Sequence, residues 1–355
     1  MKKIIVYILL ASILITGFSG CKKEPPVIHL YGEYNHGREI YFMEEYKLWY
    51  DYYHNEGMRH LFIEDSYAGA QFLNIWMQSE DDTILDELRN DLVGTFAYAE
   101  SNWEFFRLIK ENCPETVFHG NDVGHQYKTI GARYLEYLED TGMKNSEEYK
   151  IALENIEQGR IYYEVYNQIE SGRYSDDYNY REEKMAENFI REFDSLKGES
   201  VMGIYGGSHS YIDGVNTATD NTSPCMANMI HQHYGDTVTM HSTQINELID
   251  SPIHIETISV NGNDYEASYY GSCYVATMYE KYEYFYFWRL ENAYEDFKDF
   301  SKNTNNWFNG GQFPMPVSEN EVFAVDFLYK DGTIERKIFR SFLHNGEVIA
   351  TEIFV

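Results

Sequence analysis

The sequence predicts an α/β protein with a mainly parallel sheet flanked by helices, followed by a C-terminal antiparallel β-rich extension. Through the first two thirds of the chain, short apolar runs alternate with longer segments that carry apolar residues at helical spacing. Strands that alternate with helices are typical of a parallel sheet covered on both faces. After about residue 253, Asn-Gly and Asp-Gly pairs separate alternating apolar runs, as hairpin turns do.

The first 21 residues resemble a bacterial lipoprotein signal. Lys2 and Lys3 precede the apolar run 4–15, which is too short for a stable membrane helix, and small residues then lead to Cys21. We expect cleavage before Cys21, lipidation of this cysteine, and anchoring in the cell envelope on the extracytoplasmic face of a bacterial membrane. The alternative is an ordinary secretory signal peptide with an incidental cysteine.

The α/β core is expected over residues 27–252, after a short tether at 22–26. Gly57 and Gly235 stop two of its helical patterns, and Pro114 ends a third. The expected strands are 27–31, 60–64, 116–119, 200–205 and 237–240, and the expected helices are 38–56, 67–78, 81–91, 95–112, 126–140, 146–171, 178–197 and 226–234.

The β-rich extension is expected over residues 253–355. Its hairpin signals are Asn261-Gly262, Asp331-Gly332 and Asn345-Gly346. Residues 321–355 have the pattern of a three-stranded antiparallel meander, and residues 291–303 have that of one more helix. We expect the extension to pack on the edge of the main sheet.

The charge balance bears on the partners. The chain has 58 acidic and 28 basic residues, for a formal charge of −30. Such a surface repels nucleic-acid phosphates, so we expect no nucleic-acid partner. The partner that we expect on other grounds is a small-molecule or peptide substrate. Cys113, Cys225 and Cys273 match no zinc pattern and are expected to be structural or free thiols.

Acidic and imidazole side chains stand where three expected strands end. The first strand leads to Glu33 and His36, the second ends at Glu64, and the fourth leads to His209. The carboxyl ends of parallel strands meet at one edge of a sheet, where ligands bind in open α/β folds. Two carboxylates and two imidazoles there are suited to activating water or to holding a divalent metal ion.

Three further residues are secondary candidates. Asp122 and His125 follow the third strand, although Asp122 is also suited to capping the next helix. Arg181 is placed either to pair with a carboxylate at the sheet edge or to be an ordinary cation on its helix. Ser208 is not favoured as a nucleophile, because the G-x-S-x-G pattern fails at Ser210.

Several motifs together resemble the erythromycin esterase-like group. This group belongs to a wider set that includes the ChaN haem-binding lipoproteins and the Tiki/TraB proteases. The matching segments, in order, are Gly-Glu-x-x-His-Gly at 32–37, Glu64, Gly-Asn-Asp-Val at 120–123, the run 181–188, Gly-Gly-Ser-His at 206–209, and the segment from Met226 to Asp236. The resemblance covers about residues 27–242.

The resemblance implies a catalytic arrangement. His36 would be the general base that activates water, Glu33 and Glu64 would orient the water or bind a metal, and His209 would hold the substrate carbonyl or the developing oxyanion. The group's glutamate after the His-Gly pair lies one residue further on than Glu39 does here. The β-rich C-terminal region also differs from the helical tail of the antibiotic esterases, so the resemblance names no substrate.

The leading hypothesis is therefore a surface-anchored hydrolase that uses His36-assisted water on an ester, lactone or amide. The alternative is a non-catalytic lipoprotein that binds haem, a metal or another small ligand. The tyrosine-rich stretch 279–287 is expected to be a packed strand or helix, although tyrosine also ligates haem iron. A third hypothesis is a degenerate member that serves as a surface scaffold.

Overall fold

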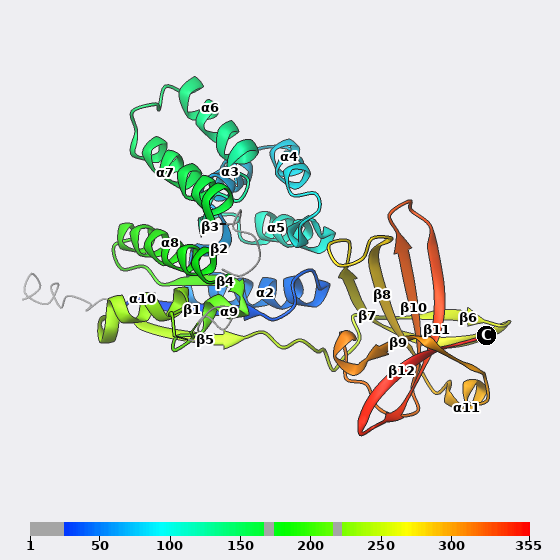
Figure 1. The fold of residues 1–355 in the computed structure, drawn as a ribbon. Coiled ribbons are helices and arrows are strands. Elements are labelled where there is room, and N and C mark those ends of the chain that lie inside the picture. Colours follow the sequence, from blue (N-terminus) through cyan, green and yellow to red (C-terminus); the bar gives the residue numbers. More distant parts are fainter. Residues whose placement is uncertain (1–24, 167–173, 216–221) are drawn as a thin grey trace, which may run out of the picture.

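The computed structural model describes residues 25–166, 174–215 and 222–355. They form a five-stranded parallel sheet of order β3-β2-β4-β1-β5 and a seven-stranded antiparallel sheet of order β6-β7-β8-β10-β11-β12-β9 (Figure 1). The predicted fold class is confirmed. The expected signal and Cys21 lie outside the described residues, and none of the described helices is long and apolar enough to cross a membrane.

The parallel sheet consists of the five strands expected in the core. They are β1 (Val27–Glu33), β2 (His60–Ser66), β3 (Val117–Asp122), β4 (Val201–Gly206) and β5 (Thr239–Gln244). The central strand β4 is buried at every position, as a strand covered on both faces must be. All five strands run in the same direction, so their carboxyl ends share one edge of the sheet.

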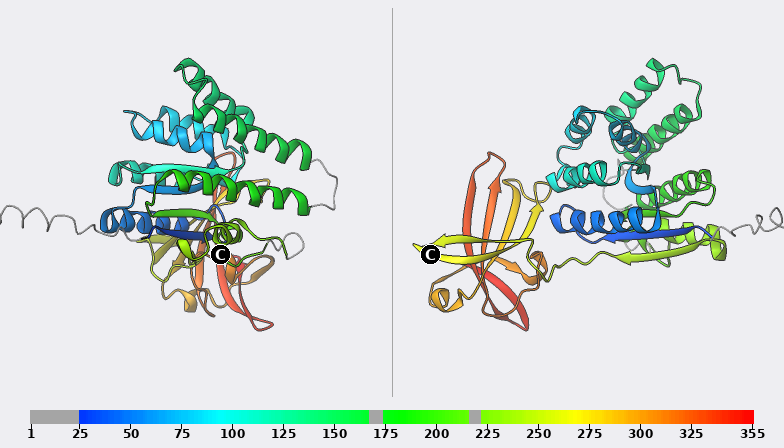
Figure 2. Two further views of the ribbon diagram at one scale, coloured as in Figure 1. Left: turned by 90° about the vertical axis from the view of Figure 1, so that its left-hand side faces the viewer. Right: turned by 180° about the vertical axis from the view of Figure 1, so that it is seen from behind.

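Helices cover both faces of this sheet, as the right-hand view of Figure 2 also shows. Leu61 and Ile63 pack into an apolar cluster with α2 to α5, whereas Phe62 faces the opposite cluster with α8 and α10. The helical elements are α2 (Glu39–Asp51), η1 (Tyr52–Glu56), α3 (Tyr67–Met77), α4 (Thr83–Asp91), η2 (Phe96–Tyr98), α5 (Glu100–Asn112), η3 (Tyr127–Gly131), α6 (Ala132–Asp140), α7 (Glu147–Ile161), η4 (Tyr162–Tyr166), α8 (Tyr174–Ser195), α9 (Gly207–Ser210), α10 (Met226–Tyr234) and η5 (Gly235–Thr237).

The second sheet is built from hairpins. Its elements are β6 (His254–Val260), β7 (Asn263–Tyr274), β8 (Tyr282–Leu290), α11 (Tyr294–Phe297), β9 (Lys302–Asn309), η6 (Gly310–Gln312), β10 (Val322–Tyr329), β11 (Ile334–His344) and β12 (Glu347–Ile353). Asn261-Gly262 and Asn345-Gly346 form turns with positive φ at both residues, which such two-residue hairpin turns require. The C-terminal meander is confirmed, and most of the tyrosine-rich stretch lies in β8.

The helix expected over residues 291–303 is wrong. Only the single turn of α11 forms, and Asn292 adopts a positive φ of 56° just before it. From Lys302 the chain pairs with β12, where Lys302 lies opposite Ile353. Pairing with β12 outweighs the local helical pattern at the end of this segment, as tertiary contacts often outweigh propensity.

The second sheet contacts the loop after β1 and the start of α2, not an edge of the parallel sheet as expected. The Tyr274 amide donates to the Gly37 carbonyl at 2.8 Å. The Glu39 carboxylate accepts hydrogen bonds from the Ser272 amide, the Ser272 hydroxyl and the Tyr269 hydroxyl at 2.9 to 3.0 Å. The end of β7 therefore holds both the β1–α2 loop and the start of α2.

Candidate active site

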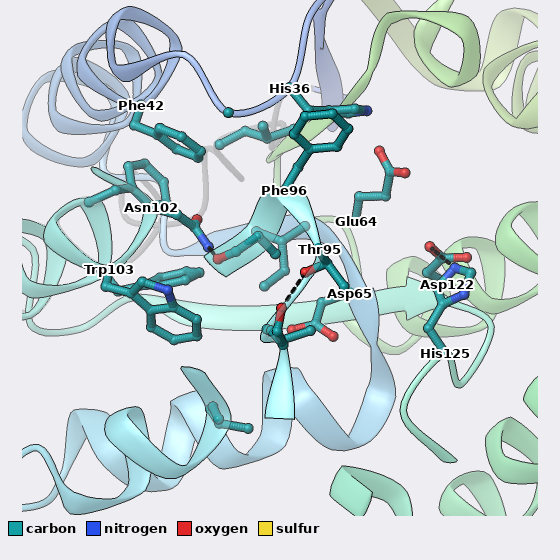
Figure 3. A pocket seen from close by; sticks show the side chains of 18 of the residues that line it. His36, Phe42, Glu64, Asp65, Thr95, Phe96, Asn102, Trp103, Asp122 and His125 are labelled. Carbon is teal, nitrogen blue, oxygen red and sulfur yellow. Dashed lines mark hydrogen bonds and ion pairs between the residues drawn. The ribbon is translucent and has the colours of Figure 1, made fainter. Parts of the chain in front are cut away.

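A cavity of about 330 Å³ opens beside the carboxyl ends of β1 to β4 (Figure 3). Six of the residues singled out in the sequence line it: Glu33, His36, Glu64, Asp122, His125 and Arg181. They come from strand ends, from the segments that directly follow β1 and β3, and from α8. The structure thus brings together side chains that lie far apart in the sequence.

His36 forms a pair with Glu33. Its Nδ1 lies 3.2 Å from Glu33 Oε1, and the imidazole is 41% exposed. Burial lowers the pKa of His36, but the hydrogen bond to Glu33 and the charges of Glu33 and Glu64 outweigh burial and raise the pKa to about 9. The resting imidazole therefore carries a proton at neutral pH, whereas the general-base role expected from the sequence requires the neutral form.

Glu64 lies between His36 and the buried side of the cluster. Its Oε2 accepts from the Gly206 amide, and its Oε1 accepts from Arg181 Nη2, each at 2.5 Å. Burial raises the pKa of this carboxyl, but the positive charges around it outweigh burial and lower the pKa to about 2. Glu64 is therefore ionised throughout the neutral range.

Arg181 is the hub of the cluster. Its Nε donates to Asp122 Oδ1 at 3.0 Å, and its Nη2 donates to Asp122 Oδ2 at 2.6 Å as well as to Glu64. The charge of Arg181 and the adjacent His125 outweigh burial and hold the pKa of Asp122 far below its ordinary value. Of the two alternatives for Arg181, pairing with carboxylates at the sheet edge is the one observed.

His125 lines the cavity on the far side of Asp122. Its Nε2 lies 3.1 Å from Asp122 Oδ2, and its Nδ1 lies 2.6 Å from the Tyr163 hydroxyl. Tyr163, from η4, also lines the cavity and was not singled out in the sequence. A tyrosine in a segment expected to be a continuous helix gave no signal that it would reach this site.

His209 belongs to the cluster but does not line the cavity. It is 4% exposed, and its Nδ1 lies 2.5 Å from Glu182 Oε1. Its Nε2 lies 3.2 Å from Arg181 Nη1 and 3.7 Å from Glu64 Oε1. Burial lowers the pKa of His209, but the charges of Glu182 and Glu64 outweigh burial and raise it. The expected contact with a substrate carbonyl therefore has no support in this arrangement, and His209 supports Arg181 and Glu64 from behind.

Glu182 is a functional neighbour that the sequence did not reveal. Its two oxygens accept from His209 Nδ1 and, at 2.7 Å, from the Met226 amide at the start of α10. Acidic residues are frequent along α8, so nothing local distinguished this one. Only the packing of α8 against α10 shows that it is 2% exposed and paired.

A second buried acid, Glu45 on α2, also lines the cavity. It is 2% exposed, and burial, together with the nearby charge of Glu33, raises its pKa well above the ordinary value. Burial therefore favours the neutral form of the Glu45 carboxyl more than that of an ordinary surface glutamate. Within the described part of the chain, Glu45 Oε1 and Glu33 Oε2 are buried oxygens without a hydrogen-bond partner.

Gly206 leaves a small space between His36 and Glu64. A Cβ placed on Gly206 would lie 3.1 Å from His36 Nε2 and 3.3 Å from Glu64 Oε2. His36 Nε2 and Glu64 Oε2 therefore both lie within 3.3 Å of one point beside Gly206, and a side chain at this position would crowd both groups.

The residues do not fit a divalent metal ion. No group of three or more His, Cys, Asp or Glu side chains in residues 25–166, 174–215 and 222–355 is arranged to hold one. The guanidinium of Arg181 already occupies the space among Glu64, Asp122 and His209 and balances their charge. Cys113, Cys225 and Cys273 are buried free thiols, as expected.

Comparisons with known proteins give similarity of fold. Neither a family model nor a curated protein sequence matches the chain. Three solved structures are similar to this chain, each at 12% sequence identity. Two of them, a Bacillus cereus protein and a succinoglycan biosynthesis protein, match 61% of this chain with a TM-score of 0.44. The third, a mutant of the erythromycin esterase EreC in its open conformation, matches 69% of this chain with a TM-score of 0.45. The matches span 65% of the first two chains and 75% of the esterase.

Proposed function

We propose that the protein is a hydrolase that uses His36-activated water to attack an ester, lactone or amide. The observation that carries this proposal is that His36 Nε2 and Glu64 Oε2 come together beside Gly206, where both residues line a cavity. A water bound in the cavity between these two groups would have a base on one side and an acceptor on the other. A well-placed base and an orienting carboxylate are the usual requirements for water activation.

The proposed reaction begins with neutral His36. Its Nε2 takes a proton from the water as the water oxygen bonds to the acyl carbon, while Glu33 holds the Nδ1 proton and stabilises the imidazolium. The bond from carbon to the leaving oxygen or nitrogen then breaks, and the imidazolium returns the proton to the leaving group. The fixed positive charge of Arg181 at the cavity wall stabilises the charge that develops on the carbonyl oxygen.

We predict that hydrolysis depends on His36 and rises with pH. His36→Ala should lower kcat/KM by about 100-fold or more, which is the usual contribution of a general base. Because the pKa of His36 is raised to about 9, the neutral base accumulates only as pH approaches that value, so kcat/KM should rise toward pH 9 and then level off. A panel of p-nitrophenyl esters, corrected for spontaneous hydrolysis, provides the measurement.

His233→Ala is the matched control for this test, because His233 is exposed on α10, away from the cavity. It should leave kcat/KM unchanged. A folded His36→Ala variant with full activity would remove His36 from the mechanism. Specific ligand binding by the wild-type protein without turnover would instead favour the alternative of a binding protein.

A second prediction concerns the space above Gly206. Gly206 has φ −54° and ψ 139°, which alanine adopts without strain, so Gly206→Ala should fold. Its methyl group would crowd His36 Nε2 and Glu64 Oε2, between which the proposed water binds. We expect kcat/KM to fall by about tenfold or more with little change in the melting temperature. Gly310→Ala is the control, since its Cβ would meet only one atom, at an ordinary 3.5 Å. Equal activity of both variants would contradict the water position.

We further propose that the protein is anchored by lipid on Cys21, on the extracytoplasmic face of a bacterial membrane. The support is the order of charged, apolar and small residues before Cys21. In a bacterial host, the full chain should incorporate labelled palmitate and fractionate with membranes. Cys21→Ser should abolish both results, whereas Cys113→Ser should not. Labelling that persists in Cys21→Ser would contradict the anchor.

A further inference from the structure

The cavity has two chemically different ends. Figure 3 shows Asp122 and His125 on one side and Phe42 and Trp103 on the other. The far end is apolar and is lined by side chains of α2 to α5 and the segment after α4. These are Phe42, Leu73, Leu88, Leu92, Phe105 and Phe106. Activating a water does not require an apolar wall. We therefore relate this wall to the part of the substrate that is attached to the reacting carbonyl.

Trp103 breaks the apolar character of this end. It is 2% exposed, it lines the cavity, and its Nε1 has no hydrogen-bond partner among the described residues. By contrast, Trp49 Nε1 donates to Thr116 at 3.0 Å, and Trp76 Nε1 donates to Asp82 at 2.9 Å. A buried N–H without a partner is costly and is rare in folded proteins. Trp103 lines the cavity, and its buried N–H still needs an acceptor.

Glu45 adds a second polar group to the same wall. Its carboxyl is buried beside the cavity, and its Oε1 is without a partner in the described part of the chain. The indole N–H of Trp103 can only donate, so it calls for an acceptor atom. Apolar walls with a few convergent polar groups are typical of small-molecule sites, and a volume near 330 Å³ lies at the small end of their range.

We propose that this end is a specificity subsite for a compact apolar group, aromatic or branched aliphatic, that carries a hydrogen-bond acceptor oxygen directed at Trp103 Nε1. The inference deepens the proposed hydrolase and rests on it for the subsite's place in a substrate. It assigns the substrate class as an ester, lactone or amide with a small apolar moiety bearing a carbonyl or ether oxygen. Charged groups are excluded from the subsite by its apolar walls.

The test is binding of two matched probes, acetophenone and ethylbenzene, which have similar shapes but differ in the acceptor oxygen. The chain has five tryptophans, and each should give its own indole signal in ¹H–¹⁵N spectra of the wild-type protein. Acetophenone should shift the Trp103 signal and leave that of Trp49 in place. Acetophenone should also bind about tenfold more tightly than ethylbenzene, and Trp103→Phe should remove that preference.

An unmoved Trp103 signal at saturating acetophenone, or equal affinities of the two probes for the wild-type protein, would overturn the subsite. The wild-type spectra decide the matter even if Trp103→Phe does not fold. Binding needs no turnover, so this test is independent of the hydrolase proposal. Binding of acetophenone without esterase activity would contradict the hydrolase proposal and leave the subsite standing. Esterase activity without binding of acetophenone would contradict the subsite and leave the hydrolase proposal standing.

Discussion

The candidate site depends on one buried cation. Arg181 donates to Glu64 and Asp122 and lies against His209, so it joins β2, β3 and the segment after β4 through α8. Without it, the buried Asp122 carboxylate and the partly buried Glu64 carboxylate would repel each other. Breaking a buried ion pair typically costs about 3–5 kcal/mol. The attraction between Arg181 and the two carboxylates is offset by the cost of removing these charges from water, so the cluster does not by itself stabilise the fold. What it provides is a fixed, ionised Glu64 beside His36.

A second constraint is the loop between β1 and α2, which carries Glu33 and His36. Arg38, the residue before α2, donates to the Gly311 carbonyl at 2.9 Å and to the Glu247 carbonyl at 3.3 Å. Glu39 holds β7 on the other side. The second sheet therefore helps to hold the loop that presents His36, and we infer that losing this contact would loosen the Glu33–His36 pair.

Much of the fold was predictable, because the signals are local. Apolar strand runs, helix-stopping Gly57 and the hairpin pair Asn345-Gly346 each act within a few residues. The parallel topology alone predicted that Glu33, Glu64 and Asp122 would lie close together at one edge of the sheet. The helix prediction for residues 291–303 failed at the end of the segment because β9, which begins at Lys302, forms only by pairing with the distant β12.

The rest of the site depends on contacts between distant elements. Glu182 gains its role from the start of α10, and Glu45 gains its raised pKa from burial and from Glu33. The burial of His209 and the high pKa of His36 likewise depend on what lies around each ring. Sequence patterns show which residue types stand at a strand end, whereas solvation and charge around them are set by the folded chain.

The measurement that tests the central claim most directly is an NMR titration of the His36 imidazole in the wild-type protein and in Glu33→Gln. Formation of the Glu33–His36 pair beside ionised Glu64 predicts a His36 pKa near 9 in the wild-type protein. Loss of the Glu33 charge should lower it clearly in the variant. A wild-type His36 that titrates at its ordinary value of 6.5, with no response to Glu33→Gln, would contradict the pair on which the proposed water activation depends.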